Sequence, residues 1–400
     1  MNEDVIRAWW AHRQGLDGSL AGASAAQVLE RIGWQRSLGG VGPYVSLFAH
    51  AGLSRQAVEK AVTAGEIREL TAARSCMYVV PAAHYALALR LRQAGGEPEI
   101  AGAKKHFDVT DAEIDRLCEA VLSALDAEPL DTRSLKSAVA GNVRDFGPEG
   151  QKRGVTSTLP LALGKLEGAG EIRRVAHEGR LDEKRYSYAR WRDNPLAAVK
   201  ISDEEAHTEL ARQYFRWIGP ARLAHFQWFS GLSAKAARTA IAPLDLVPLD
   251  SGDERLMFPE DREALYAFET PDEPHIVLTN NFDNIIHLRR DVSEVLGDVT
   301  DLHRLYGEQG TQQAGGLTDL QSHPILDRGR LIGLWEYDVQ PAAIVWATLD
   351  PPGPEVSAAV ARMEDYVRGE LGECRSFGMD RPEARKPRIA ALREMAAARV

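Results

Sequence analysis

The sequence predicts an α+β protein in which three tandem helical units, each closed by a β-hairpin, precede a C-terminal β-rich, barrel-like domain. Three observations predict this class. Short apolar segments with helical spacing come in groups, and each group ends in two alternating runs joined by turn residues. Beyond residue 273, β-type runs take over. The expected units cover residues 1–103, 104–200, 201–273 and 274–400.

The third unit shows the pattern most clearly, at residues 207–243. Three short helices are expected there, with Gly219 ending the first helix. Gly231 and Ser233 are placed as the C-terminal and N-terminal caps between the second and third helices. Two apolar runs around residues 250–253 then predict a hairpin. Three helices followed by a two-stranded hairpin is the pattern of a winged helix, whose third helix can enter a DNA major groove.

The first unit carries a glycine-rich loop at residues 33–44, after a helix capped by Ser24. Four glycines and a proline in these twelve residues favour unusual backbone dihedral angles. The loop holds polar and aromatic side chains suited to recognition, namely Trp34, Gln35, Arg36, Ser37 and Tyr44. The alternative is a helix connection whose aromatic rings belong to the core. No Gly-Lys-Ser/Thr follows, which excludes a phosphate-binding P-loop.

Hairpins are also predicted in the first and second units. Runs at 67–70 and 76–80 close the first unit, and residues 171–190 form the clearest hairpin of the chain. The second hairpin carries a basic and aromatic set, Arg173, Arg174, Arg180, Lys184, Arg185, Tyr186, Tyr188 and Arg190. Such a wing suits phosphate contact and base stacking. The alternative is an edge hairpin that its charges keep soluble.

Composition limits the class of protein. The formal net charge of −10 argues mildly against nucleic acid, yet residues 151–200 hold 11 basic and 6 acidic side chains, so a basic face is possible. Three scattered cysteines indicate a reducing cytoplasm rather than disulfides or a zinc site. No signal peptide or membrane span is predicted. We expect a monomer without metal or cofactor, since the histidines show no ligand spacing.

The fourth segment has a different character. Runs at 275–290, 329–338 and 342–349 predict strands, and residues 356–371 predict a closing helix. A small β-rich domain with a barrel-like sheet is therefore expected.

Four segments in order resemble one family, the winged-helix DNA-binding proteins that include the AlkZ and YcaQ crosslink-repair DNA glycosylases. They are ARSCMYVVPAAHY, ARQYFRWIGPARLAHFQWFSGLSAKAARTAI, LTNNFDNIIHLRRD and HPILDRGRLIGLWEYD. The resemblance implies three winged helices in a curved arrangement plus a β-domain, and double-stranded DNA as the partner.

The resemblance is incomplete at the residues that carry activity. Characterised members have Gln-x-Gln or Gln-x-Asp near the first helices, where this chain has Gln35-Arg36-Ser37. Asn284 replaces the Glu of a Phe-Asp-Glu segment, and a His common in the first wing is missing around Met77. The resemblance implies either a DNA glycosylase that excises alkylated or crosslinked bases, or a DNA-binding protein without that activity.

A monofunctional glycosylase must stabilise a cationic sugar and orient a water molecule. Gln35 is the candidate for orienting water, Ser37 is a weaker second group, and Asp283 can supply a carboxylate if its segment faces the cleft. The alternatives are a surface position for Gln35 and a structural turn for Asp283.

DNA contacts are expected from the same region. Arg36 and Arg74 would hold phosphates beside the lesion, and Tyr44 or Trp34 could stack on an exposed base. For Arg74 an internal ion pair is an equal alternative.

Overall fold

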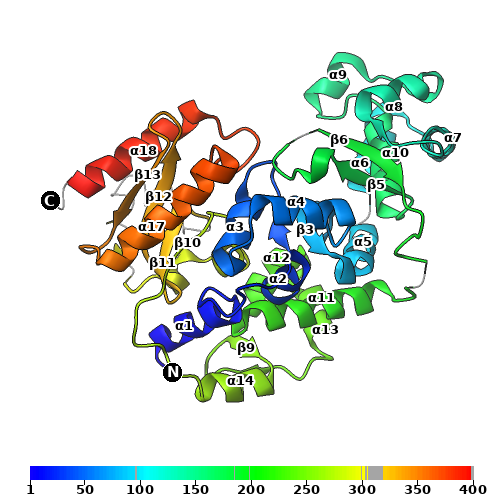
Figure 1. Cartoon of the computed structure of the whole chain (residues 1–400). Helices are drawn as coiled ribbons and strands as arrows, with labels where there is room; N and C mark the ends of the chain where they lie inside the picture. Colours follow the sequence, from blue (N-terminus) through cyan, green and yellow to red (C-terminus); the bar gives the residue numbers. More distant parts are fainter. Residues whose placement is uncertain are drawn as a thin grey trace.

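The computed structural model describes residues 1–94, 97–183, 185–197, 199–298, 300–301, 304 and 319–397. Figure 1 shows the second unit as a lobe at the upper right and the C-terminal sheet with its helices at the left. The first and third units lie between and below them. Within the described ranges, no helix is long and apolar enough to cross a membrane.

The first unit begins and ends with helices around a three-stranded sheet. Its elements are α1 Glu3–Arg13, α2 Ala25–Ile32, β1 Gln35–Arg36, α3 Gly42–Ala51, α4 Arg55–Ala64, β2 Ile67–Thr71, β3 Met77–Pro81 and α5 Tyr85–Ala94. Helix α2 starts where predicted, because Ser24 and Gln27 form a reciprocal capping box. Helix α4 ends at Gly65, which takes the left-handed conformation that a glycine allows.

The second and third units repeat this organisation. The second unit contains α6 Pro98–Phe107, α7 Asp111–Ala124, β4 Leu130–Asp131, α8 Thr132–Ala138, α9 Gly147–Lys152, α10 Leu159–Gly168, β5 Ile172–Ala176 and β6 Tyr186–Arg190. The third unit contains α11 Asp203–Ile218, β7 Ala221–Arg222, α12 Leu223–Ser230, α13 Ala234–Ile241, β8 Val247–Pro248, β9 Arg255–Met257 and α14 Pro259–Tyr266. The predicted caps Gly231 and Ser233 occupy these positions.

The three small sheets share one topology. Their strand orders are β1-β3-β2, β4-β6-β5 and β7-β9-β8, and all pairs are antiparallel. In each sheet a short first strand pairs with the last strand of a hairpin. The three predicted hairpins are therefore present, as β2–β3, β5–β6 and β8–β9.

The hydrophobic cores do not coincide with the four expected units. Residues of the second unit pack around a core of their own, for example Leu117, Leu135 and Leu163. The first unit instead shares one core with the third unit and another with the C-terminal sheet. Trp34 of the first unit and Trp217 of the third lie in the same core, with ring centroids 5.7 Å apart.

The C-terminal part is an open antiparallel sheet between two long helices. Its elements are β10 Ile276–Leu278, α15 Asn284–His287, β11 His323–Asp327, β12 Arg330–Asp338, β13 Ala343–Thr348, α17 Pro354–Tyr366 and α18 Pro382–Ala397. The strand order is β10-β11-β12-β13, and this half barrel confirms the expected barrel-like sheet in part. Trp335 packs on the α17 side and its neighbour Leu334 on the α18 side, because successive strand residues face opposite ways.

The strand expected at 275–290 is much shorter than predicted. Only Ile276–Leu278 is extended, and α15 begins after Asp283. The Asp283 carboxylate accepts a hydrogen bond from the Ile285 amide, so it caps α15 and ends the extended run.

The glycine-rich loop is fastened to the C-terminal part. The Val41 amide donates to the Arg375 carbonyl at 3.0 Å, and the Gly378 amide donates to the Leu38 carbonyl at 2.9 Å. A Cβ atom at Gly40 would lie 2.4 Å from the Arg375 carbonyl oxygen. Only glycine therefore allows this approach of two backbones.

We predict that Gly40→Ala destabilises the protein by about 2 kcal/mol, because neither backbone can give way without losing these hydrogen bonds. Urea denaturation measures the change. Gly102→Ala, where a Cβ would meet open space on α6, is the control and is expected to be neutral or slightly stabilising. Equal stabilities of the two variants would contradict the prediction.

Candidate functional site

Three of the five candidate residues of the glycine-rich loop, Gln35, Arg36 and Ser37, lie on strand β1 or directly after it. Gln35 is paired with Val79 of β3, and Val79 is paired with Glu69 of β2. Because strand residues alternate between faces, Gln35, Ser37 and Glu69 share one face of the sheet. Arg36 lies on the opposite face, 5.3 Å from the centroid of the Tyr78 ring.

Gln35 is fully buried, and only one end of its amide has a partner. Its Nε2 donates to the Phe282 carbonyl at 3.0 Å. Its Oε1 has no hydrogen-bond partner among the described residues. A buried carbonyl oxygen left in this state costs about 1–3 kcal/mol, so such atoms often bind water or a ligand. The amide is therefore oriented by the protein, with its acceptor oxygen unused.

Asp283 directly follows Phe282, whose carbonyl holds Gln35, and is also fully buried. Its Oδ2 accepts a hydrogen bond from Ser46 Oγ at 2.5 Å and lies 3.0 Å from His50 Nε2. Burial alone would raise its pKa, but His50, the Ser46 hydroxyl and the Ile285 amide together hold the pKa below its usual value. The carboxylate thus fixes the 280–284 loop against α3, rather than facing a cleft as the sequence reading required.

The same loop has further buried contacts with the first unit. Asn280 Nδ2 donates to the Gly42 carbonyl at 3.0 Å and to Ser46 Oγ. Asn284 Nδ2 donates to the Ile32 carbonyl at 3.0 Å. The Asn that replaces Glu in this segment therefore has a structural partner at the end of α2.

Ser37 does not stand alone beside Gln35. Its hydroxyl donates a short hydrogen bond to Glu69 Oε1. Burial raises the pKa of the Glu69 carboxyl, while the Ser37 hydrogen bond and the charge of Arg174 oppose the rise. Sequence reading missed Glu69, and only the sheet register could have indicated it.

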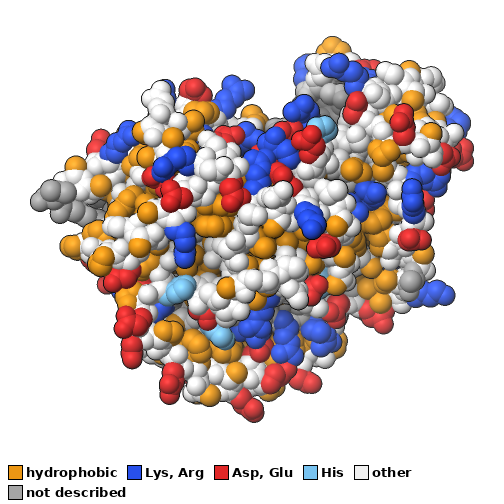
Figure 2. Space-filling view, viewed as in Figure 1, with side chains coloured by type: hydrophobic (Ala, Val, Ile, Leu, Met, Phe, Trp, Pro, Cys, Tyr) orange, Lys and Arg blue, Asp and Glu red, His pale blue; other side chains and the backbone are white. Residues whose placement is uncertain are grey.

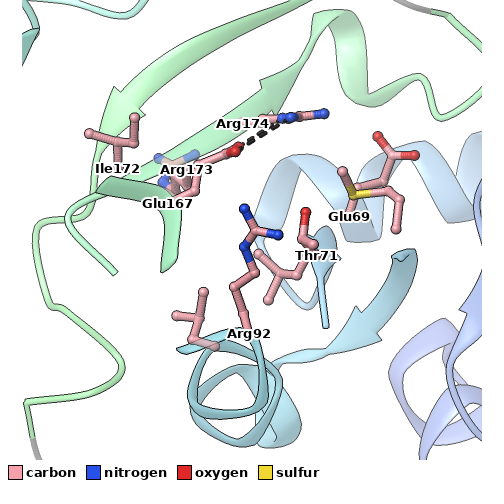
Figure 3. Close-up of a pocket in the computed structure, with 10 residues that line it drawn as sticks. Glu69, Thr71, Arg92, Glu167, Ile172, Arg173 and Arg174 are labelled. Carbon is pink, nitrogen blue, oxygen red and sulfur yellow. Dashed lines mark hydrogen bonds and ion pairs between the residues drawn. The ribbon is translucent and has the colours of Figure 1, made fainter. Parts of the chain in front are cut away.

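Glu69 borders two pockets between the first and second units. One has a volume of about 310 Å³ and is also lined by Arg68, Arg173 and Arg174. The other, drawn in Figure 3, shares Glu69, Arg173 and Arg174 with it. In Figure 3 Glu69 lies across this pocket from the Arg174–Glu167 ion pair.

Two arginines stack on the ring of Trp228. Arg74 lies 4.1 Å and Arg290 4.9 Å from the ring centroid of Trp228. Arg74 lies at the tip of the β2–β3 hairpin. Its side chain packs closely against Gly231, where a Cβ atom would lie only 2.7 Å from the Arg74 Cγ. His287 meets the edge of the same Trp ring and lies 3.4 Å from Asp319. Arg74, Trp228, His287 and Arg290 form what we call the Trp228 cluster.

Comparison with known proteins decides the family. A family model described as DNA glycosylase AlkZ-like matches residues 40–368 of this chain. The chain belongs to the AlkZ-like DNA glycosylase family. The structure is also similar to the DNA glycosylase AlkZ of Streptomyces sahachiroi, with a TM-score of 0.67 and 19% sequence identity. That match covers 94% of this chain and 98% of the other. A comparison with curated proteins found no match.

This AlkZ-like chain differs from the sequence expectations at its aromatic candidates. Tyr44 is fully buried, and its hydroxyl accepts a hydrogen bond from the Leu181 amide at 2.9 Å. Trp34 is equally buried, and its Nε1 donates to His84 at 3.1 Å. Both rings belong to the core in this structure, which is the alternative that the loop composition left open.

The basic hairpin of this AlkZ-like protein is largely neutralised by its own acids. Arg174 pairs with Glu167 at 2.8 Å, and Arg180 pairs with Asp182 at 2.9 Å. Arg185 lies 3.1 Å from Glu183, with its side chain 77% exposed. Lys184 lies outside the described residues. Arg173 is different, because it stacks over Trp191 at 5.7 Å instead of facing a carboxylate.

One group of side chains has a spacing that could hold a metal ion. Potential ligand atoms of His225, Asp291 and Glu294 lie within 4.8 Å of one another. However, Arg222 Nη1 lies 2.6 Å from Glu294 and 3.5 Å from Asp291. Burial, followed by the charges of Arg289 and Arg222, lowers the pKa of His225 to about 4. The arginine already supplies the positive charge that these carboxylates need.

We predict that Asp283→Ala destabilises the protein by about 3 kcal/mol, because it leaves His50 and Ser46 without their buried partner. Asp131→Ala removes an N-cap of α8 whose carboxylate is exposed, and should cost about 1 kcal/mol. Urea denaturation compares the two. Losses of equal size would contradict a structural role for the buried carboxylate.

The buried Asp283 carboxylate should also make the free energy of unfolding depend on pH. Its folded-state pKa is lowered, so its contribution to stability is present above the unfolded value of about 3.9 and is lost as pH falls below it. The unfolding free energy of the wild type should therefore fall more steeply below about pH 4 than that of Asp283→Asn. Parallel pH profiles would exclude this contribution.

Proposed function

We propose that this protein is a monofunctional DNA glycosylase that excises alkylated or crosslinked bases from double-stranded DNA without a metal ion. The observation that carries the proposal is the Gln35 amide, whose nitrogen is held by the Phe282 carbonyl while its oxygen has no partner among the described residues. A carbonyl oxygen fixed in this way can accept a hydrogen bond from a water molecule and orient it.

The chemistry needs little acid assistance. An alkylated purine already carries positive charge, so the bond to the sugar breaks as the base becomes neutral. The sugar then develops positive charge, and the oriented water adds to its anomeric carbon. A neutral glutamine suits this step, since it aligns the water without requiring a change of protonation. In this proposal Asp283 is a positioning residue, because it holds the loop that carries the Phe282 carbonyl.

DNA contact is proposed through winged helices in a curved arrangement. The shared strand order of the three small sheets supports the winged-helix reading. Figure 2 shows basic and acidic side chains mixed on this face, with a basic group in the hollow beside the second-unit lobe. Arg36, Arg74 and Arg290 are the proposed phosphate ligands near Gln35. On the second hairpin, Arg173 stacks on Trp191, and Arg185 is exposed although it pairs with Glu183. Both are better candidates than the less exposed Arg174 and Arg180, which are also paired.

Base excision from a duplex also needs the nucleotide to leave the stack. Gln35 and Ser37 are both buried, so a flipped nucleotide reaches them only when the surrounding segments shift. The proposal therefore includes a conformational change on DNA binding.

A second candidate function is DNA binding without base excision. It is favoured by Ser37, which stands where characterised glycosylases have a second Gln or an Asp. It is also favoured by the family match, which begins at residue 40 and leaves the Gln35-Arg36-Ser37 tripeptide just outside.

We predict that the purified protein excises alkylated purines or unhooks a nitrogen-mustard crosslink in duplex DNA, and that Gln35→Ala slows single-turnover excision about 100-fold. Gln14→Ala is the control, because Gln14 is equally buried and its amide also donates to main-chain carbonyls. No excision by the wild type, together with salt-sensitive DNA binding, would favour the second function. Full activity of Gln35→Ala would remove Gln35 from the site.

Binding to DNA should also depend on salt. We predict that Arg74→Ala and Arg290→Ala each reduce the slope of log affinity against log salt by about 1, because each removes one phosphate contact. Arg393→Ala is the control, since Arg393 is exposed on α18 and pairs with Asp338. Fluorescence anisotropy over a range of salt concentrations measures the slopes. Unchanged slopes in both variants would exclude the Trp228 cluster as a phosphate site.

A further inference from the structure

We propose that Glu69 is a further catalytic residue, a carboxylate held by Ser37 that faces the cationic sugar and accepts a proton from the attacking water. The proposal rests on the proposed glycosylase function. As the bond between sugar and base breaks, its electron pair goes to the base nitrogen. The water oxygen bonds to the anomeric carbon, and one water proton moves to the Glu69 carboxylate, which later releases it to solvent.

The sheet register places Glu69 with Gln35. Both residues pair with Val79, one from each side, so they lie in one row across three strands. Neighbouring strands lie about 4.8 Å apart, so the two Cα atoms are about 10 Å apart. Both side chains project from the same face, and each is long enough to cover about half of this distance. The short Val79 side chain projects from the same face between them. A water molecule that contacts both the amide and the carboxylate would therefore lie above Val79.

Ser37 gives the carboxylate a fixed orientation. It follows β1 and presents its hydroxyl to Glu69 Oε1 on the face that Gln35 also uses. A serine hydroxyl cannot stabilise a cationic sugar by charge. By hydrogen-bonding a glutamate two strands away, it fixes the Glu69 carboxyl on the face of the sheet that Gln35 shares. The tripeptide and β2 together thus supply an amide and a carboxylate at one site.

Glu69 differs from Glu167, an acid that lines the pocket drawn in Figure 3 with it. Glu167 is neutralised by Arg174, its partner at 2.8 Å. Among the described residues, Glu69 has no cation within ion-pair distance, although Arg68, Arg173 and Arg174 line the same pocket. Arg68 and Arg173 instead stack on Trp191, 5.4 and 5.7 Å from its ring centroid. A structural carboxylate would be expected to pair with one of these cations.

The environment of Glu69 suits both parts of its role. Burial raises the pKa of this carboxyl, which makes the carboxylate a stronger base toward water. Partial burial also strengthens its attraction for a developing positive charge, because the local dielectric constant is lower than in water. Arg68 and Arg173 could bind a phosphate of the same nucleotide in the pocket of about 310 Å³.

Single-turnover excision by the full-length protein tests the residue directly. Glu69→Gln should slow excision about 100-fold without loss of folding. Glu167→Gln, in the pocket drawn in Figure 3 that Glu69 also lines, serves as the matched control and should change the rate less than threefold. The wild-type rate should fall as acid protonates Glu69, and this acid limb should be absent in Glu69→Gln. A wild-type rate and an unchanged pH profile in Glu69→Gln would overturn the proposal.

Moving the carboxylate tests the geometry. Glu69→Ala should be as slow as Glu69→Gln, and the double variant Ser37→Asp with Glu69→Ala should regain at least tenfold, because the new carboxylate lies on the same face of the sheet. Ser37→Ala keeps Glu69 but loses its orientation, and should be slowed about tenfold with its acid limb retained. Failure of the double variant to exceed Glu69→Ala, when both fold, would count against a shared position.

A binding measurement separates this proposal from the proposed function. Duplexes with a cationic pyrrolidine in place of the sugar are compared with duplexes containing neutral tetrahydrofuran. The wild type should prefer the cationic analogue at least tenfold, and Glu69→Gln should lose the preference. A wild type that excises bases but binds both duplexes equally would overturn the role of Glu69 alone. A wild type that excises nothing would overturn the glycosylase function, and the analogue preference would still decide whether Glu69 faces a cation.

Discussion

The buried contact between Asp283 and the His50–Ser46 pair of α3 is the constraint on which the arrangement of the site depends. Both α3 residues come from the first unit, whereas Asp283 belongs to the C-terminal part. This contact fixes the 280–284 loop, and the loop in turn supplies the carbonyl that holds Gln35. Removing a buried charge partner is costly because the remaining polar groups cannot reach water. The orientation of the Gln35 amide therefore depends on a segment almost 250 residues later in the sequence.

Local sequence signals predicted much of the fold. Capping residues such as Ser24, Ser233 and Gly231 fall where they were expected, since helix ends are decided within a few residues. Hairpins were also located, because alternation and turn residues are local patterns. The short strands β1, β4 and β7 escaped prediction. Two residues carry no periodicity, and each strand forms only because a distant hairpin supplies its partner.

The candidate site was harder to predict because its determinants are long-range contacts. Gln35 and Ser37 were chosen from a family resemblance, but the hydrogen bond from Ser37 to Glu69 depends on sheet register. Tyr44 and Trp34 looked available for stacking in the sequence, yet both are enclosed by the packing of other units. Arginine-rich hairpins illustrate the same limit, since Arg174 and Arg180 are neutralised by Glu167 and Asp182. A group of arginines in a sequence therefore indicates a basic surface only once the acidic residues that pair with them are known.

The separate core of the second unit affects how the protein unfolds and how it tolerates substitutions. The first unit, third unit and half barrel share side-chain packing, so they should gain and lose structure together. Most buried side chains of the second unit pack in a separate core, although Leu181 of its hairpin region belongs to the core shared by the first unit and the half barrel. The hairpin of the second unit nevertheless supplies one wall of the pocket beside Glu69. Gln35 and Ser37 thus lie within the shared packing, whereas the wall opposite Glu69 comes from a unit with a largely separate core, so substitutions in that wall can change the shape of the pocket with little effect on Gln35 and Ser37.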